Sequence, residues 1–117
     1  MNHIAVYGSL KRGYYNHSLI ETQEFIGNGT VYGYQLYDLG YYPAAVQEKS
    51  EKELLVEVYS IENSIIFQRV DLMEIGAGYD RTIECIDIDG KIYPCWIYYF
   101  ETAHKGWKLL PSNKWSE

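Results

Sequence analysis

Apolar positions along this chain fall mostly in short runs and alternating segments, a pattern typical of strands. Residues 3–7 and 54–59 are β-rich apolar runs, as expected of buried strands. Segment 24–39 holds aromatic and β-branched residues interrupted by glycines, which indicates strand with a bulge or turn. A turn at 40–43 follows, because Pro43 removes a ladder donor, and 44–47 resumes a short strand.

One longer segment has the spacing of an amphipathic helix. The pattern predicts a helix that begins near 60–63, runs to about Glu74 and packs on the sheet. We expect Gly76 and Gly78 to end it by adopting left-handed backbone angles. The apolar residues that define this pattern, and that we expect in the core, are Ile65, Ile66, Val70, Leu72 and Met73.

The Asp89-Gly90 pair predicts a two-residue hairpin turn between the last two long strands. With this turn, Cys85 lies opposite Pro94, so that Cys95 is on the other face of the ribbon. We therefore expect two free thiols and no disulfide.

The remaining segments are short. Residues 16–22 predict a short helix with Asn16 or Ser18 as its N-cap. Residues 48–53 carry mixed charges and predict an exposed loop, and residues 104–117 predict a tail that covers apolar surface. One substantial helix between strand pairs indicates an α+β fold, in a single domain over residues 1–117.

Composition narrows the partners and the compartment. The 117 residues are 47% hydrophobic. Their formal charge of −6, with scattered Lys and Arg, argues against nucleic acid as a binding partner. No apolar run approaches the roughly 18 residues that cross a bilayer, and no secretory pattern opens the chain, so we expect a cytoplasmic protein without membrane contact. The histidines His3, His17 and His104 share no ligand spacing, so we expect no metal.

The opening strand breaks at Gly8 into a charged loop with a second glycine at position 13. Such a turn leaves backbone N–H groups free to bind an anion or a carbonyl oxygen. A phosphate-binding P-loop is rejected, because Tyr14 and Tyr15 stand where Lys and Ser or Thr are needed. Ser9 lacks the context of a nucleophilic serine, so its N–H is the useful group.

These residues carry a family resemblance. Tyr7-Gly8-Ser9-Leu10, with Lys11-Arg12-Gly13 and Asn16 after it, resembles the opening signature of the gamma-glutamylcyclotransferase-like (AIG2-like) family. Further matching segments follow in the family's order and extend the resemblance over nearly the whole chain: Pro43 to Val46, Val58-Tyr59, Asp71 to Glu74, and Tyr79 to Arg81. One departure is Ile75, which follows the acidic residue where the family commonly has Gly.

The resemblance implies a small mixed β-barrel with a few helices packed outside. It also implies a cofactor-independent enzyme whose small-molecule substrate is a γ-glutamyl amine or peptide. The α-amino group of the substrate attacks its own γ-carbonyl, giving 5-oxoproline and a free amine. Glu74 matches the catalytic glutamate, and we expect a monomer or weak homodimer. The expected substrate-binding residues are Tyr7, Gly8, Ser9, Leu10, Tyr79 and Arg81.

Glu74 also has a physical argument of its own. Its apolar neighbours and the negative end of the helix dipole disfavour the anion, so its pKa should rise toward neutrality. Position alone favours a solvated helix-end glutamate by roughly two to one, and the resemblance reverses those odds. Asp71, one turn earlier, is expected to be a structural hydrogen-bond acceptor.

Two alternatives stay open. Tyr79 and Arg81 share one strand face and could both reach a substrate. A pairing of Arg81 with a surface carboxylate is expected about equally. For the whole protein, the alternative function is a binding or interaction protein that holds a small carboxylate in the same pocket without turnover.

Overall fold

The computed structural model describes residues 2–116, so the end residues Met1 and Glu117 of the predicted domain lie outside the described residues. The elements are β1 (Asn2–Val6), the 3-10 turn η1 (His17–Leu19), β2 (Glu24–Val31), β3 (Tyr34–Asp38), β4 (Pro43–Gln47), β5 (Leu54–Ile61), α1 (Ser64–Gly76), β6 (Asp80–Ile88), β7 (Lys91–Tyr99) and β8 (Lys108–Leu109). Strands form where the apolar runs and alternating segments predict them, but β5 extends to Ile61, into the region predicted to begin the helix, and β8 lies in the tail, where no strand was predicted.

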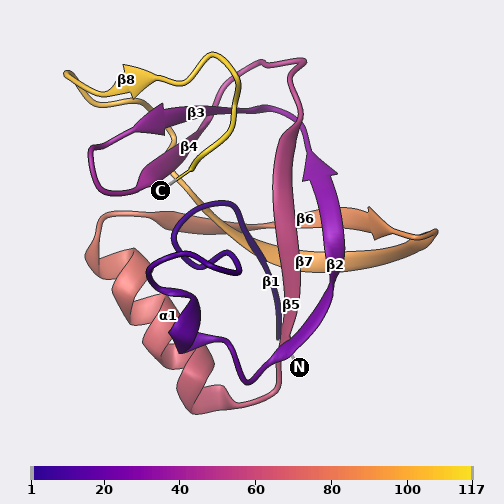
Figure 1. The fold of residues 1–117 in the computed structure, drawn as a ribbon. Helices are drawn as coiled ribbons and strands as arrows, with labels where there is room; N and C mark the ends of the chain where they lie inside the picture. The colour runs from indigo at the N-terminus through magenta and orange to yellow at the C-terminus, as the bar shows by residue number, and fades with distance from the viewer. Residues whose placement is uncertain (1, 117) are drawn as a thin grey trace.

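The strands form two sheets, with orders β2-β5-β1-β7-β6 and β4-β3-β8. The larger sheet is mixed, because β1 runs antiparallel to β5 and parallel to β7. Its strands turn from the direction of β2 and β5 to that of β6 and β7, while α1 covers one side and the smaller sheet lies beyond one end (Figure 1). The expected α+β barrel is confirmed as a curled half-barrel sheet with one α-helix within residues 2–116.

Side chains of β1 alternate between two apolar clusters. Ile4 and Val6 are buried with Val70 of α1, whereas Ala5 packs with Val58 in the cluster on the other face of the sheet. Because both faces of β1 are covered, the strand reads as a continuous apolar run. The loop that follows β1 is consequently attached to one of the most buried strands of the molecule.

Helix α1 packs on the sheet with a narrower apolar face than predicted. Val70 is fully buried, and Ile66 and Met73 pack against its cluster. The expectation of a core position was wrong for Ile65 and Leu72, which are 58% and 75% exposed. Both side chains lie outside the stripe of residues that faces the sheet.

The two ends of α1 have different causes. At the start, the Asn63 side chain accepts hydrogen bonds from the N–H groups of Ile65 and Ile66, at 2.9 and 3.2 Å. At the end, the helix continues to Gly76, and only Gly78 has a left-handed φ, of +102°. The prediction for Gly76 was wrong because this type of helix end needs a single left-handed residue.

The predicted helix over residues 16–22 is only the 3-10 turn His17–Leu19. Asn16 makes no side-chain cap there. Its Nδ2 donates instead to the Ser9 hydroxyl, at 2.9 Å. The side chain expected to begin a helix is thus engaged in holding the loop after β1.

The hairpin and the tail agree with the predictions. Cys85 pairs with Pro94 in the β6–β7 register, and the two thiols are free, Cys85 exposed and Cys95 buried. Asp89 and Gly90 have φ of 52° and 85°, as a two-residue hairpin turn requires. The tail adds β8 to β3 and buries Trp115 in the core. No helix within the described range 2–116 is long and apolar enough to cross a membrane.

Candidate active site

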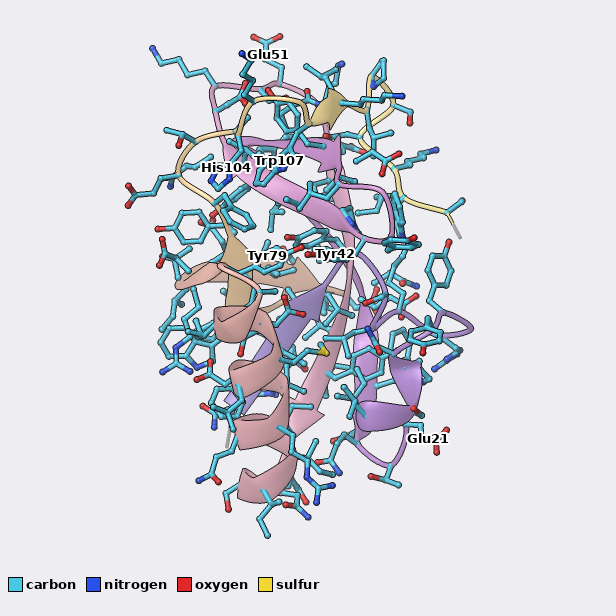
Figure 2. All side chains as sticks on the ribbon, turned by 90° about the vertical axis from the view of Figure 1, so that its left-hand side faces the viewer. Glu21, Tyr42, Glu51, Tyr79, His104 and Trp107 are labelled. Atoms are coloured by element: carbon cyan, nitrogen blue, oxygen red, sulfur yellow. The ribbon has the colours of Figure 1, made fainter. Side chains whose placement is uncertain are left out.

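A cavity of about 170 Å³ lies between the end of β1, the loop after it and the C-terminal half of α1. Figure 2 shows two of its side chains, Tyr42 and Tyr79, just beyond the C-terminal end of α1. The lining is mostly apolar, and it consists of Ala5, Val6, Tyr7, Gly8, Ser9, Leu10, Asn16, Tyr42, Pro43, Met73, Glu74, Ala77, Tyr79 and Tyr98.

The loop after β1 is closed by its own hydrogen bonds. Lys11 N–H donates to the Gly8 carbonyl at 3.0 Å, and Asn16 N–H donates to the Ser9 carbonyl at 2.8 Å. The N–H groups of Gly8, Ser9 and Leu10 have no acceptor among residues 2–116. These three residues line the cavity, so their donors are available to a carbonyl or carboxylate oxygen of a ligand.

Gly8 is required by close packing rather than by its backbone angle. A Cβ at this position would lie 2.8 and 2.9 Å from Cγ and Cδ of Pro43. The pyrrolidine ring cannot move aside as a flexible side chain can. Because Gly8 has no side chain, β4 and the loop after β1 can meet at the wall of the cavity.

Glu74 brings an ionisable group into this apolar lining. Burial raises the pKa of its carboxyl group to about 7, because desolvation penalises the anion. Within residues 2–116 the side chain makes no hydrogen bond or ion pair. Its backbone carbonyl is held by the N–H groups of Ala77 and Tyr79, both at 3.1 Å. The carboxyl is thus placed by the helix end and left free to interact with a ligand.

Two buried phenols join the strands around the cavity. The Tyr7 hydroxyl donates to the Tyr98 carbonyl at 2.7 Å and accepts from the Ala45 N–H at 3.0 Å. The Tyr79 hydroxyl donates to the Pro43 carbonyl. Burial raises the pKa of both phenols far above the ordinary value, so both stay neutral. At neutral pH both phenols are therefore hydrogen-bonding groups that join backbone segments and do not exchange protons.

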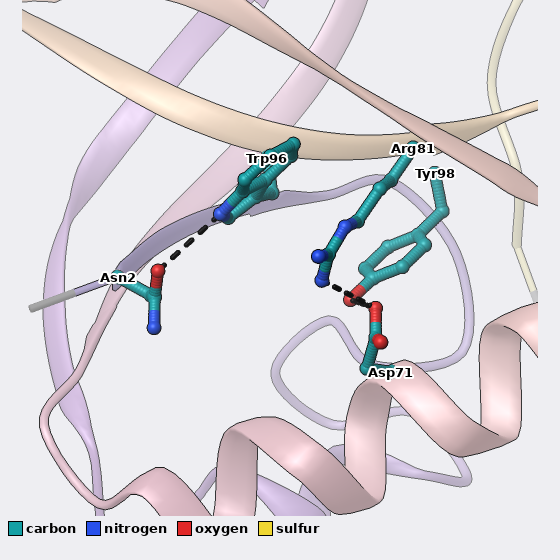
Figure 3. A network of polar contacts seen from close by, with 5 residues as sticks. All are labelled: Asn2, Asp71, Arg81, Trp96 and Tyr98. Carbon is teal, nitrogen blue, oxygen red and sulfur yellow. Dashed lines mark hydrogen bonds and ion pairs between the residues drawn. The ribbon is translucent and has the colours of Figure 1, made fainter.

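Asp71 and Arg81 form a separate polar network beside the cavity (Figure 3). Arg81 Nη1 lies 2.8 Å from Asp71 Oδ1, which also accepts a hydrogen bond from the Tyr98 hydroxyl at 3.0 Å. The Arg81 guanidinium lies 4.3 Å from the centre of the Trp96 ring. Asp71 is a hydrogen-bond acceptor here, and Arg81 lies outside the cavity lining.

The cavity brings together six of the seven residues expected at the site, all but Arg81. Tyr42, Met73, Ala77 and Tyr98 also line it and were not predicted. The position of Tyr98 within the hairpin follows from the strand register. Its place at the cavity, however, depends on β7 lying beside β1, which no local pattern reveals. Within residues 2–116, no group of three or more His, Cys, Asp or Glu side chains is placed to hold a metal ion.

Comparison with known proteins agrees with the geometry. The model of the family "Gamma-glutamyl cyclotransferase, AIG2-like" matches residues 4–117. A protein of Pyrococcus horikoshii named "Putative gamma-glutamylcyclotransferase PH0828" is 40% identical over 90 residues, which cover 77% of this chain and 73% of that protein. The "Gamma-glutamylcyclotransferase family protein YtfP" of Escherichia coli is 31% identical over 112 residues, which cover 96% and 94%.

Solved structures share the fold. The crystal structure of PH0828 matches with a TM-score of 0.75 at 31% identity, covering 97% of this chain and 89% of that one. An AIG2-like protein from Mus musculus matches with a TM-score of 0.81 at 23% identity, covering 99% and 88%. The chain therefore belongs to the gamma-glutamyl cyclotransferase, AIG2-like family.

Proposed function

We propose that this protein is a γ-glutamyl cyclotransferase that converts a γ-glutamyl amine or peptide into 5-oxoproline and a free amine without a cofactor. The observation that carries the proposal is the desolvated Glu74 carboxyl in the same cavity as three backbone N–H groups without an acceptor. Membership of the family supports the reaction class.

Glu74 supplies the proton transfers. The substrate's α-nitrogen bonds to its γ-carbonyl carbon, and the bond from that carbon to the amine nitrogen breaks. Overall, two protons leave the α-ammonium nitrogen and arrive at the departing amine, so no water and no oxidant take part. A carboxyl with a pKa of about 7 accepts and returns protons effectively near neutral pH.

The loop after β1 stabilises the charge that develops during attack. The γ-carbonyl oxygen becomes an oxyanion when the α-nitrogen adds to the carbon. The N–H groups of Gly8, Ser9 and Leu10 are the donors available to it, and the apolar lining strengthens these interactions by excluding water. Ile75, the departure from the family pattern, is 46% exposed and does not line the cavity.

A panel of γ-glutamyl compounds with amino-acid, dipeptide and alkylamine leaving groups tests the proposal, with 5-oxoproline as the measured product. We expect turnover of at least one compound. Calorimetric binding without any 5-oxoproline would instead identify a non-catalytic binding protein that uses the same pocket. If no compound in the panel binds and none yields 5-oxoproline, both functions are excluded.

The Glu74→Gln variant tests the assigned role. Gln keeps the shape of Glu but cannot exchange a proton, so we expect turnover to fall by about 10²–10⁴-fold while substrate affinity changes little. Asp71→Asn is the matched control on the same helix, and we expect it to lower stability more than rate. Near wild-type turnover in Glu74→Gln, with a large loss in Asp71→Asn, would show that the wrong acid has been named.

A further inference from the structure

The tail of the chain is hydrogen-bonded to the loop after β1. Lys11 Nζ donates to the Trp115 carbonyl at 3.0 Å, and the Tyr14 hydroxyl donates to the same oxygen at 3.1 Å. These bonds join residues 104 and 101 positions apart in the chain. Because a carbonyl oxygen has two lone pairs, that of Trp115 can accept both bonds at once. The tail therefore holds the loop after β1 at two points.

The two donor side chains also contact each other. The Lys11 ammonium group lies 4.5 Å from the centre of the Tyr14 ring, in a cation–π contact. Both side chains are half-buried, and neither lines the cavity of the candidate active site. They are therefore placed to hold the loop and not to touch a substrate.

Trp115 is anchored in the core. Its side chain is 9% exposed and belongs to the apolar cluster that contains Ala5 and Tyr7, both of which line the cavity. The indole N–H has no acceptor among residues 2–116, so packing alone holds the ring. The residues on either side, Lys114 and Ser116, are exposed. A buried ring thus fixes the carbonyl that receives the two donors.

The tail is also attached just before Trp115. The Leu110 N–H donates to the Leu36 carbonyl of β3 at 2.9 Å, and the Gln35 side chain donates to the Leu110 carbonyl at 2.8 Å. Lys52 Nζ donates to the Pro111 carbonyl at 2.7 Å. The tail therefore runs from the smaller sheet to the loop after β1 with attachments at both ends.

We propose that this tail is a strap in which Trp115, through Lys11 and Tyr14, positions the loop after β1 for catalysis. The inference rests on the proposed function, because it takes the N–H groups of residues 8–10 to stabilise the oxyanion. Lys11 directly follows these residues, so a shift of Lys11 also shifts the donors. Trp115, Lys11 and Tyr14 are positioning residues, since none of them lines the cavity.

A positioning role affects kcat more than KM. The oxyanion donors act on charge that develops only in the transition state, so their displacement lowers kcat and leaves KM nearly unchanged. Misplacing a catalytic group by about 1 Å can cost roughly 10²-fold in rate. Release of the strap should cost less, because the loop keeps the hydrogen bonds from the Lys11 and Asn16 N–H groups to its own carbonyls.

The Lys11→Met/Tyr14→Phe double variant releases the strap without removing a core side chain. Met keeps the aliphatic stem of Lys and Phe keeps the ring of Tyr, so the two donors to Trp115 are lost and little packing changes. We expect kcat for 5-oxoproline release to fall by about tenfold, with KM within about twofold of the wild type. Lys11→Arg keeps a cationic donor and should keep kcat within about twofold. If the double variant does not fold, the single variants Lys11→Met and Tyr14→Phe take its place.

Amide hydrogen exchange measures the position of the loop without any turnover. The Asn16 N–H donates to the Ser9 carbonyl at 2.8 Å, and this bond closes the loop. We expect exchange at Asn16 to be about tenfold faster in Lys11→Met/Tyr14→Phe than in the wild type, because the released loop opens more often.

The matched control is Lys52→Met/Tyr32→Phe. It removes the same two functional groups, a Lys ammonium group that donates to a tail carbonyl, that of Pro111, and a Tyr hydroxyl that donates to Glu53 at 3.2 Å. Neither residue lies in the loop after β1 or lines the cavity. We expect the control to keep wild-type kcat and wild-type exchange at Asn16.

The outcomes separate the strap from the proposed function. Unchanged kcat in Lys11→Met/Tyr14→Phe, or an equal fall in the control, overturns the strap while the cyclotransferase function stands. If the wild type releases no 5-oxoproline from any γ-glutamyl compound, the proposed function fails, and exchange at Asn16 decides on the strap. Faster exchange in Lys11→Met/Tyr14→Phe but not in the control then supports the strap, and unchanged exchange overturns it.

Discussion

At the scale of single residues, the candidate site depends on a hydrogen-bond partner that Glu74 lacks and on a Cβ that Gly8 lacks. Glu74 lacks a hydrogen-bonding partner among residues 2–116, and desolvation therefore controls its pKa. Gly8 lacks a Cβ, and the loop after β1 can therefore approach Pro43. An unpaired carboxyl in an apolar cavity disfavours folding at neutral pH, as expected where activity and stability conflict.

The pKa of Glu74 predicts how its replacement changes stability with pH. Between its ordinary value of 4.5 and about 7, the unfolded chain releases the proton while the folded protein keeps it, so stability falls as pH rises. Glu74→Gln lacks this fall. We expect the variant to be more stable than the wild type at pH 8, by up to about 3 kcal/mol, and equally stable near pH 4.

Urea unfolding of both proteins at pH 4, 6 and 8 measures this difference. Between the ordinary and the raised pKa of Glu74, the wild-type free energy of unfolding should fall relative to that of Glu74→Gln. Above this pH range, the free energies of the two proteins should change in parallel. A constant difference at all three pH values would mean that Glu74 is solvated in the folded protein.

At the scale of elements, local sequence patterns predicted the structures that form between residues close together in the sequence. The Asp89-Gly90 turn and its register needed only the turn residues and the alternation around them. The tail is different, because Asn113 holds it from a distance. The Asn113 side chain accepts from the Leu36 N–H at 2.6 Å and donates to the Tyr34 carbonyl at 2.9 Å. No periodicity in residues 104–117 signals that a polar side chain there pairs with β3.

The replacement Asn113→Ala tests this anchor. It leaves two buried backbone groups without partners and puts Ala at a φ of 55°, which Asn tolerates better. We expect a loss of about 2 kcal/mol or more, together with faster amide exchange at Leu36. Lys114→Ala, at the exposed neighbouring position, is the control and should lie within about 0.5 kcal/mol of the wild type. Unchanged exchange at Leu36 would contradict the anchoring role.

The candidate site was predictable to the extent that it is continuous in sequence. Residues 7–10 stand together in one motif, whereas Glu74 needed the family resemblance as well, because its position alone favoured a solvated glutamate. The place of Tyr98 at the cavity depends on which strands become neighbours. Such long-range packing is decided by the whole core, and one sequence read locally does not contain it.

At the scale of the whole molecule, the curl of the larger sheet depends on glycine at one edge. A Cβ at Gly29 of β2 would overlap Cγ2 of Ile86 in β6, although β2 and β6 are the two outer strands of the sheet. The absent side chain lets these edges pack together. The candidate site is lined by residues from the end of β1, from β7 and from α1.

Gly29→Ala is expected to destabilise the fold by about 1–3 kcal/mol, because the added methyl group forces the two edges apart. Gly76→Ala is the matched control, since its Cβ meets nothing within 4 Å and its backbone is helical. That change should stabilise the protein by roughly 0.5–1 kcal/mol. Thermal unfolding of the two variants measures both effects, and a neutral Gly29→Ala would show that the edges do not pack tightly.

The hydrogen bond from the Tyr7 hydroxyl to the Tyr98 carbonyl joins residues 91 positions apart in the chain. During protein synthesis, the loop after β1 is made well before its neighbouring strand β7. With elongation at roughly 5–20 residues per second, the loop waits several seconds for that partner. A polypeptide released before β7 is complete therefore lacks the Tyr98 side of the cavity, and the site closes only once β7 has been made.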